Sequence, residues 1–302
     1  MTATHLNFKT APGHQILAAA GKKILRPGGR EATEQLFQWA NFQPGETVLE
    51  LAASFGESAI AMAKRFGVRV VGIEKNPDSV AIATEKIRAA GLESQVTIIE
   101  GDIFHLDAIS EQFDYVLAEA ILTMQSQDAK LKVLQGIRDR LKPGGKFLSH
   151  ELLARDNEKN IHQTLSQAIR VNATPLSQAG WREVCEAGGL EVQQHNTGKM
   201  GLLNPAQMLR DEGLLGTLRI VWNVLTKAQI RERVRQMRHA FKQHEADLGY
   251  IVFWASINKL GIMNYELGMM GIRSGSFDNF VTRSMETLFK AILTPPGHKY
   301  EY

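Results

Sequence analysis

The sequence predicts an α/β fold in which a doubly wound, mostly parallel sheet carries helices on both faces. Short apolar runs alternate with helical patterns from residue 47 to residue 148, and this alternation is typical of βαβ units. The connections between them are short and rich in turn-forming residues, so right-handed crossovers are expected. Ligands of such sheets bind beyond the carboxyl ends of the strands.

Residues 47–58 are the stretch around which the other elements are arranged. A short apolar run from Val48 to Leu51 is followed by small residues, and a helical pattern opens at Ala59. Free backbone amides at a helix start, beside side chains too small to block approach, can cradle a polar or anionic ligand. A second apolar run ends at Glu74, the spacing at which a βαβ unit places a carboxylate near ribose hydroxyls.

The remaining elements follow in chain order by the same criteria. A helix at 31–40 precedes the first strand, and a short helix at 16–23 is either a flap over a site or a surface arm. Further strands are predicted at 96–100, 113–119, 190–195 and 250–257, and one more follows Leu141-Lys142-Pro143-Gly144-Gly145, where a helix ends and the chain turns. Further helices are predicted around 59–63 and at 77–90, 129–141, 161–171 and 181–187.

The segment before the last strand is far longer than an ordinary connection, so it must fold as an element of its own. It contains an apolar helical stretch at 206–225 and a basic helix at 227–247. Four basic residues recur on one side of that second helix, where they either draw in an acidic substrate or face water: Arg231, Arg235, Arg238 and Lys242. Residues 259–302 contain a loop of glycine and methionine and a helix at 278–293, which would cover the core, clamp a partner subunit or close over substrate.

Composition excludes several classes of protein. The single cysteine, Cys185, rules out an internal disulfide and a thiolate metal cluster, and we assign no metal site. A net charge of +3 is too small to predict binding to nucleic acid. No apolar run approaches the ~20 residues that span a bilayer, and the N-terminus has no apolar core of a signal peptide. We therefore expect a cytoplasmic protein without stable membrane insertion.

From about residue 25 to residue 258 the chain resembles the class I S-adenosylmethionine (SAM) dependent methyltransferases. Their first motif reads acid-x-Gly-x-Gly-x-Gly, and this chain has Glu50-Leu51-Ala52-Ala53-Ser54-Phe55-Gly56, in which Ala52 and Ser54 replace two glycines. The Leu-Lys-Pro-Gly-Gly element at 141–145 is a second match. The resemblance implies a methyltransferase domain at 1–258 with a seven-stranded sheet. We expect helical cap insertions at about 156–178 and 199–249 to form the acceptor pocket, and residues 259–302, which lie outside the resemblance, to be a C-terminal extension.

The resemblance also implies that SAM is the cofactor, and which residues contact it. The Gly28-Gly29 pair and Thr33 would hold its methionine end, although a plain turn and helix start explains them equally well. Glu74 and its neighbour Lys75 would lie at the ribose, and Asp102 and Ile103 at the adenine. The full set is Gly28, Gly29, Thr33, Glu50, Ala52, Ala53, Ser54, Gly56, Glu74, Lys75, Asp102, Ile103 and Glu119.

Methyl transfer from a sulfonium requires alignment of the reactants and exclusion of water, and no covalent nucleophile. If the acceptor is a hydroxyl or a carbon acid, a base is needed, and the ordinary histidine pKa of about 6.5 suits that task. His150 is the first candidate, followed by Glu119 and Glu151. The alternative is that all three are hydrogen-bonded residues at the edge of the sheet.

The expected function is therefore transfer of a methyl group from SAM to oxygen, nitrogen or carbon of a small-molecule acceptor, and a homodimer is compatible with it. One alternative is a fold relative that binds SAM without turnover, or serves only as a structural subunit. Another is a SAM enzyme with different chemistry, such as cyclopropane formation on lipids.

Overall fold

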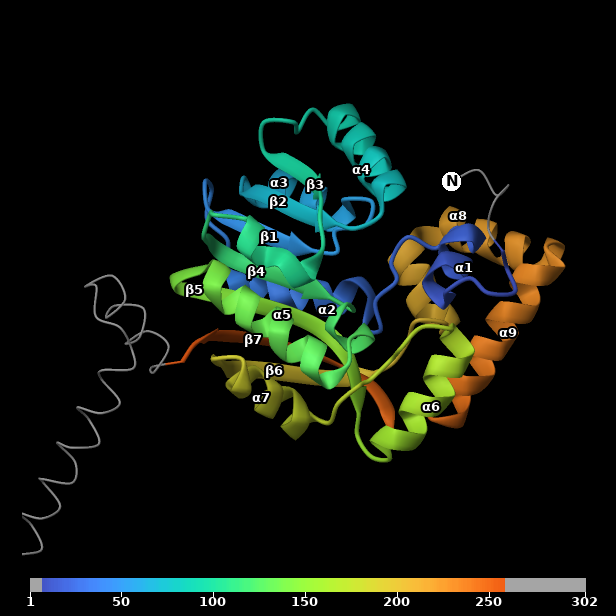
Figure 1. The fold of residues 1–302 in the computed structure, drawn as a ribbon. Helices are drawn as coiled ribbons and strands as arrows, with labels where there is room; N and C mark the ends of the chain where they lie inside the picture. The colour runs from blue at the N-terminus through green and yellow to red at the C-terminus, as the bar shows by residue number, and fades with distance from the viewer. Residues whose placement is uncertain (1–6, 259–302) are drawn as a thin grey trace, which may run out of the picture. The chain divides into compact units, whose positions relative to one another are not determined.

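A seven-stranded sheet runs through the described part of the chain, residues 7–258 of a computed structural model (Figure 1). Its strands are β1 (Thr47–Leu51), β2 (Arg69–Glu74), β3 (Val96–Glu100), β4 (Phe113–Glu119), β5 (Leu141–Ala154), β6 (Leu190–Lys199) and β7 (Leu248–Ile257). They follow the order β3-β2-β1-β4-β5-β7-β6. Neighbours from β3 to β5 are parallel, and β7 runs antiparallel to both β5 and β6. The predicted fold class is confirmed.

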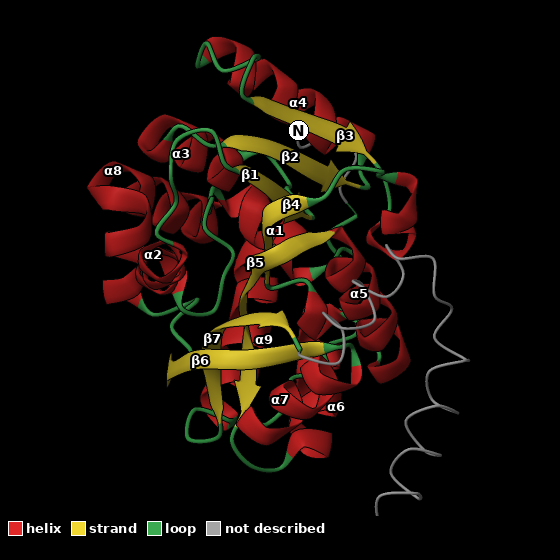
Figure 2. Ribbon diagram, turned by 90° about the vertical axis from the view of Figure 1, so that its left-hand side faces the viewer, coloured by secondary structure: helices red, strands yellow, loops and turns green. Residues whose placement is uncertain are grey.

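Helices cover both faces of the sheet (Figure 2). In chain order they are α1 (Gly13–Ala20), α2 (Gly29–Ala40), α3 (Glu57–Phe66), α4 (Pro77–Ala89), the 3-10 helices η1 (Ile103–Ala108) and η2 (Leu122–Met124), α5 (Gln127–Arg140), α6 (Glu158–Ile169), α7 (Gln178–Ala187), α8 (Pro205–Thr226) and α9 (Ala228–Gln243). On one face, Leu36 of α2, Met62 of α3 and Ile87 of α4 share a buried apolar cluster. The helices α5 and α7 pack together on the other face.

The central strands read as apolar runs because helices bury them on both sides. Val48, Leu49 and Leu51 of β1 are at most 2% exposed. Since the neighbouring strands are parallel, their carboxyl ends lie at the same edge of the sheet. The register pairs Glu119 of β4 with His150 of β5 at that edge, which brings together two residues singled out by the sequence.

A helical cap formed by α1, α6, α8 and α9 lies beside the sheet (Figure 1). Apolar side chains of all four helices, including Ile16, Leu165, Ile220 and Met237, share one buried cluster. The helices α8 and α9 make up the long connection between β6 and β7, which folds as its length predicts.

Several local features differ from the sequence prediction. The helices α6 and α7 each begin three residues earlier than predicted, β5 already begins at Leu141, and β6 extends four residues further. The first helix begins and ends three residues earlier than predicted, because Gly21 adopts a left-handed conformation with φ of 105° and ends it. The 3-10 helices η1 and η2 were not predicted, since such short turns leave no periodic pattern. The start of η1 depends on Asp102, whose side chain accepts a hydrogen bond from the backbone amide of Phe104 at 3.1 Å.

The described residues up to Ile257 belong to one compact unit. The predicted helix at 278–293 and the glycine and methionine loop before it lie outside the described residues. Within residues 7–258, none of the helices is both long enough and apolar enough to pass through a membrane.

Candidate functional site at the carboxyl edge of the sheet

The turn after β1 is built from residues in left-handed conformations. Ala52, Ser54 and Gly56 have φ values of 53°, 51° and 73°. This conformation costs a residue with a Cβ on the order of 1 kcal/mol, so the surrounding structure must hold Ala52 and Ser54 there. The amide of Gly56 donates to the carbonyl of Ala53 at 2.9 Å, which closes the turn. The turn thus keeps a glycine-type backbone path although two of its three glycines are replaced.

The second strand holds this turn in place. The backbone amide of Ala53 donates to the carbonyl of Ile73 at 2.9 Å. The Glu74 carboxylate accepts the amide of Ser54 at 2.8 Å and, with its other oxygen, the amide of Asn76 at 2.9 Å. Gly72 permits this approach, because a Cβ at that position would lie 2.7 Å from Cβ of Ala53. Glu74 therefore bridges the loops after β1 and β2.

Lys75 and Asp102 meet at the tips of β2 and β3. The ammonium of Lys75 lies 2.8 Å from Oδ2 of Asp102, and the Lys75 side chain is 79% exposed, so the pair adds little stability. Burial tends to raise the pKa of Asp102, but the bonds from Lys75 and from the Phe104 amide outweigh it and the pKa is lowered. Ile103, next in the chain, is buried.

A second cluster joins the loop before α2 to the tip of β4. Nε of Arg26 lies 3.1 Å from Oε2 of Glu119, while its other nitrogens donate to the hydroxyls of Thr33 and Ser58. The hydroxyl of Thr33 donates to Oε1 of Glu119 at 2.5 Å, and that of Ser58 donates to Oε2 at 3.1 Å. Ser58 is the second residue of α3, directly after the left-handed turn. The cluster around Glu119 and the contacts of Glu74 therefore flank the same turn.

Two buried carboxyl groups of this cluster have pKa values shifted in opposite directions. Burial tends to raise the pKa of Glu119, but the Arg26 guanidinium, with His150 and Thr33, lowers it to about 2. Burial and the charge of Glu119 raise the pKa of Glu50 to about 8, against the effect of Arg26. Oε2 of Glu50 is buried without a hydrogen-bond partner among the described residues. At neutral pH Glu119 is ionised and Glu50 is mostly protonated.

His150 is fully buried between Gly28 and Glu119. Its Nε2 accepts the backbone amide of Gly28 at 3.0 Å, and its Nδ1 lies 3.5 Å from Oε1 of Glu119. Because Nε2 acts as an acceptor, we assign the proton of the neutral ring to Nδ1, which faces the carboxylate. Burial lowers the pKa of His150, although Glu119 opposes it. Nε2 is therefore occupied by the Gly28 amide, whereas Nδ1 faces Glu119 without a hydrogen-bond partner among the described residues.

Glu151 lies on the opposite face of β5 from His150, since successive side chains of a strand alternate. Its carboxylate accepts the amides of Leu122 and Thr123 at 3.0 and 2.8 Å and the Thr123 hydroxyl at 2.6 Å. Burial raises its pKa to about 7, while these hydrogen bonds oppose the rise. Glu151 thus holds η2 and does not join the cluster of Glu119 and His150.

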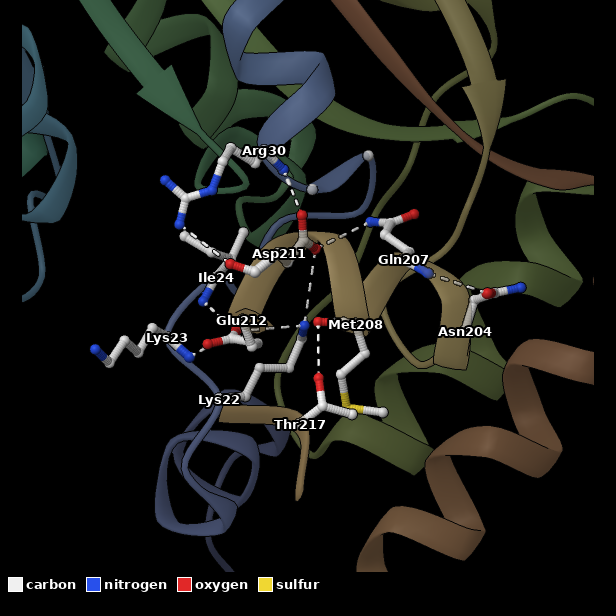
Figure 3. A network of polar contacts seen from close by, with 12 residues as sticks. Lys22, Lys23, Ile24, Arg30, Asn204, Gln207, Met208, Asp211, Glu212 and Thr217 are labelled. Atoms are coloured by element: carbon white, nitrogen blue, oxygen red, sulfur yellow. Dashed lines mark hydrogen bonds and ion pairs between the residues drawn. The ribbon is translucent and has the colours of Figure 1, made fainter. Parts of the chain in front are cut away.

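The loop that carries Gly28 and Gly29 is fastened to the first half of α8 (Figure 3). The carboxylate of Asp211 accepts the amide of Arg30 at 2.8 Å, and that of Glu212 accepts the amides of Lys23 and Ile24 at 2.9 Å. The Lys22 ammonium is buried 3.9 Å from Asp211 and 3.7 Å from Glu212. The cap therefore fixes the loop that precedes α2.

His14 of α1 lies within electrostatic reach of Glu74, at the other end of the edge. Solvent reaches its ring, yet enough protein surrounds it that desolvation lowers its pKa, while the Glu74 carboxylate raises it in part. The cap thus approaches the tip of β2 as well as the loop before α2.

Sequence reasoning missed the residues that connect these parts: Arg26, Ser58, His14 and Asp211. For Arg26 a signal existed, because a lone cation beside Pro27-Gly28-Gly29 could have been paired with an acid at a strand end. The others carry no local pattern. Among residues 7–258, no group of three or more His, Cys, Asp or Glu side chains is placed to hold a metal ion.

Comparisons with known proteins agree with this geometry. A family model described as a methyltransferase domain matches residues 48–145, which contain the left-handed turn and the tips of β1 to β4. An uncharacterized protein of Haemophilus influenzae is 36% identical over 244 residues, which make up 80% of this chain and 97% of that protein. Methyltransferase GfsG of Streptomyces halstedii is 26% identical over 154 residues, which make up 51% of this chain and 54% of GfsG.

Among solved structures, a SAM-dependent methyltransferase from Thiobacillus denitrificans in complex with S-adenosyl-L-homocysteine has the same fold. It superimposes with a TM-score of 0.58 at 18% identity and covers 81% of this chain and 98% of its own.

Proposed function

The chain belongs to the class I SAM-dependent methyltransferase family, and from this premise we propose that it transfers a methyl group from SAM to oxygen, nitrogen or carbon of a small-molecule acceptor. The observation that carries the proposal is the edge of the sheet itself. Two polar clusters, around Glu74 and around Glu119, flank a turn of left-handed residues. An adenosyl group and an amino acid on a sulfonium need such an arrangement, with one polar site for each end.

For the adenosine end we propose Glu74, Lys75, Asp102 and Ile103. Each carboxylate oxygen has about two acceptor positions, so Glu74 can hold both loop amides and still accept ribose hydroxyls. The buried side chain of Ile103 would lie against the base, and Asp102 would accept from its amino group.

For the methionine end we propose Glu50, Glu119, Gly28, Gly29 and Thr33. The buried Oε2 of Glu50 lacks a donor within the described chain, and an ammonium group would supply one. The charge of Glu119 favours the same cationic end. A buried acid whose pKa is raised to about 8 would ionise more readily beside a cation, so the residues present fit this cofactor.

When bound, SAM supplies a methyl group already activated by the sulfonium charge. The protein then has to align the acceptor and keep water out, and such orientation can contribute up to ~7 to 11 kcal/mol. The cap of α1, α6, α8 and α9, which contains the predicted insertions at 156–178 and 199–249, would bind the acceptor.

We propose positioning roles for the three candidate bases. His150 holds the amide of Gly28, Glu119 is ionised within its cluster, and Glu151 holds η2. Nε2 of His150 is occupied by Gly28, and the Glu119 carboxylate is bound by Arg26 and two hydroxyls. Glu151 is buried against η2 on the opposite face of β5. The acceptor would then be a group that is nucleophilic without help from these residues, such as a neutral amine or an acidic hydroxyl.

The direct test is calorimetry with SAM and with S-adenosylhomocysteine. The wild-type chain should bind both, and Glu74→Ala should weaken binding by about tenfold or more, since hydrogen bonds to a charged group contribute roughly 1.5 to 3 kcal/mol. Glu93→Ala, an exposed acid that precedes β3 at the opposite end of the strand, is the matched control and should leave binding unchanged.

The outcomes separate the alternatives. Release of S-adenosylhomocysteine with a panel of amines and acidic hydroxyl compounds would support methyl transfer. Binding without release against such a panel would favour a SAM-binding relative without turnover. Absence of binding to either compound would overturn the proposal.

A further inference from the structure

The second half of α8 turns an apolar stripe toward solvent. All the large hydrophobic side chains that are exposed within the described residues belong to this helix. Six of them, here called the α8 stripe, follow Gly213: Leu214, Leu215, Leu218, Val221, Trp222 and Leu225. Trp222 is 68% exposed and Leu215 is 83% exposed. Apolar groups gathered in this way mark an interaction site.

The α8 stripe lies on one side of the helix. Its other members lie three, four or seven residues from Leu218 in the chain, which places them on one face. The opposite face is held by the cap: Ile220 is buried, and the side-chain amide of Asn223 donates to the carbonyl of Ala20 at 3.0 Å. The helix is thus docked by its inner face, and its outer face has no partner within the described residues.

Gly213 separates this part from the first half of α8. Its backbone is not helical, with φ of 71° and ψ of 176°, so the helix is interrupted there. The first half is fixed by the contacts of Asp211 and Glu212 with the loop at 22–30 (Figure 3). The stripe is therefore presented by a helix that the protein holds rigidly at both its inner face and its N-terminal end.

The segment that carries the stripe has basic charges only, and the next acid in the chain, the exposed Glu232, pairs with Arg235. Residues 213–231 contain no Asp or Glu and three basic residues, Arg219, Lys227 and Arg231. All three are exposed. Arg219 is next to Leu218 in the chain, Lys227 directly follows the helix, and Arg231 donates to the carbonyl of Leu225 at 2.6 Å. The stripe is thus bordered by three exposed cations, and residues 213–231 contain no acid that could neutralise them.

We propose that the α8 stripe docks the protein onto the surface of an anionic lipid membrane. A helix with Leu and Trp on one face and Lys or Arg at its borders lies in the interface plane, where the apolar side chains enter the acyl boundary and the cations meet lipid phosphates. The helix lies on the membrane and does not cross it, because its inner face and first half are committed to the protein. This inference does not depend on methyl transfer.

Charge complementarity favours lipid over a second copy of the chain. In a two-fold dimer the same patch meets itself, so Arg219, Lys227 and Arg231 of each copy would approach the partner's stripe without any acid of that segment to pair with. Like charges brought together across an interface are unfavourable. A layer of anionic headgroups supplies the missing partners.

The test is sedimentation of the purified full chain with vesicles. The probes are vesicles of equimolar phosphatidylglycerol and phosphatidylcholine, and vesicles of phosphatidylcholine alone. We expect binding to the anionic vesicles that decreases with added salt, and much weaker binding to the neutral ones. The variant Leu218→Ser with Trp222→Ser should lose about tenfold or more in affinity, because it removes two of the groups that enter the interface.

Leu209→Ser is the matched control, since Leu209 is an exposed leucine of the same helix on the other side of Gly213. It should bind as the wild type does. Lys227→Glu with Arg231→Glu should abolish the preference for anionic lipid. Circular dichroism of every variant should match the wild type, because each substituted side chain is exposed.

Two results would overturn the proposal. One is equal sedimentation of the wild type and the stripe variant with anionic vesicles. The other is a wild-type dimer in light scattering that the stripe variant dissociates, without vesicle binding by either protein, which would identify the stripe as an interface between copies.

Discussion

At the scale of single residues, the site depends on side chains held in unfavourable states. Ala52 and Ser54 adopt left-handed conformations that glycine adopts without strain. Glu50 and Glu119 are buried carboxyl groups whose pKa values move apart to about 8 and about 2. Such states persist only where surrounding contacts impose them, and they concentrate at functional sites.

The left-handed conformation of the turn predicts that Gly56→Ala lowers the free energy of unfolding, whereas Ala52→Gly leaves it nearly unchanged. Ala52→Gly relieves left-handed strain of about 1 kcal/mol and loses a comparable amount through the greater freedom of the unfolded chain, so its unfolding free energy should stay within about 1 kcal/mol of wild type or rise. Gly56→Ala should lower it by about 1 kcal/mol or more. Urea unfolding measures both. A loss for Ala52→Gly as large as that for Gly56→Ala would show that residue 52 is unstrained.

Glu50 predicts a specific dependence of stability on pH. The folded state keeps a proton on Glu50 up to about pH 8, whereas the unfolded chain releases it near the ordinary pKa of 4.5. Its contribution to stability is therefore fully present below about pH 4.5 and is lost as the pH rises through about 8. Glu50→Gln imitates the protonated form. It should match wild type near pH 5 and exceed it by about 2 kcal/mol or more at pH 8.

Urea unfolding at a series of pH values measures this difference. Glu100→Gln, an exposed acid at the tip of β3, is the control and should show the same difference from wild type at every pH. If the Glu50→Gln difference were also constant, Glu50 would be ionised in the folded protein.

At the scale of elements, α8 links the cap to the loop at 22–30. Its first half accepts backbone amides of the loop at 22–30, and that loop continues into the Gly28 amide bound by His150. Its second half carries the apolar stripe. The interruption at Gly213 allows one helix to serve both purposes, because the two halves can present different faces.

The link through Asp211 predicts that a change in the cap alters SAM binding. Asp211→Ala removes the buried acceptor of the Arg30 amide and one partner of Lys22, and should lower the unfolding free energy by about 2 to 3 kcal/mol. It should also weaken SAM binding, measured by calorimetry, because Gly28 and Gly29 lose their support. Asp156→Ala, at an exposed acid, is the control. Unchanged SAM affinity in a destabilised Asp211→Ala would place the loop outside the cofactor site.

At the scale of the whole molecule, the sheet positions most of the site residues, and the cap adds contacts from outside the sheet. The sheet edge brings together residues from β1, β2, β4 and β5, and the cap contributes His14 and the fastened loop. Methyltransferase GfsG matches 51% of the chain, whereas the Haemophilus relative matches 80% of it.

Because the two clusters flank one turn, binding of SAM should stabilise the fold as a unit. At about 100 times its dissociation constant, a ligand adds about 2.7 kcal/mol to the free energy of unfolding. For a domain of this size that corresponds to a rise in Tm of about 5 to 10 °C, measurable by differential scanning calorimetry. Glu74→Ala should reduce the rise at equal SAM concentration, and ATP, which lacks the sulfonium and the amino acid, should produce none. Equal rises with ATP and SAM would mean that the Glu119 cluster does not recognise the methionine end.

The sequence by itself determined the elements and the family. The periods of the apolar pattern, the caps and the turn residues act over a few positions, so β1 to β7 and the helices α2 to α9 could be located from them, along with Glu50, Glu74 and the turn at 52–56. Strand alternation could also have separated His150 from Glu151, because it is a local rule.

Only the tertiary structure decided which side chains meet across long distances. Arg26 finds Glu119, Lys22 finds Asp211, and the same packing sets the pKa values of Glu50 and Glu119 through burial. It also decided that the α8 stripe faces water, since periodicity shows that a helix has an apolar side but not what lies against it. The physical reason is that burial and charge pairing are properties of the assembled fold, whereas propensity and periodicity are properties of neighbouring residues.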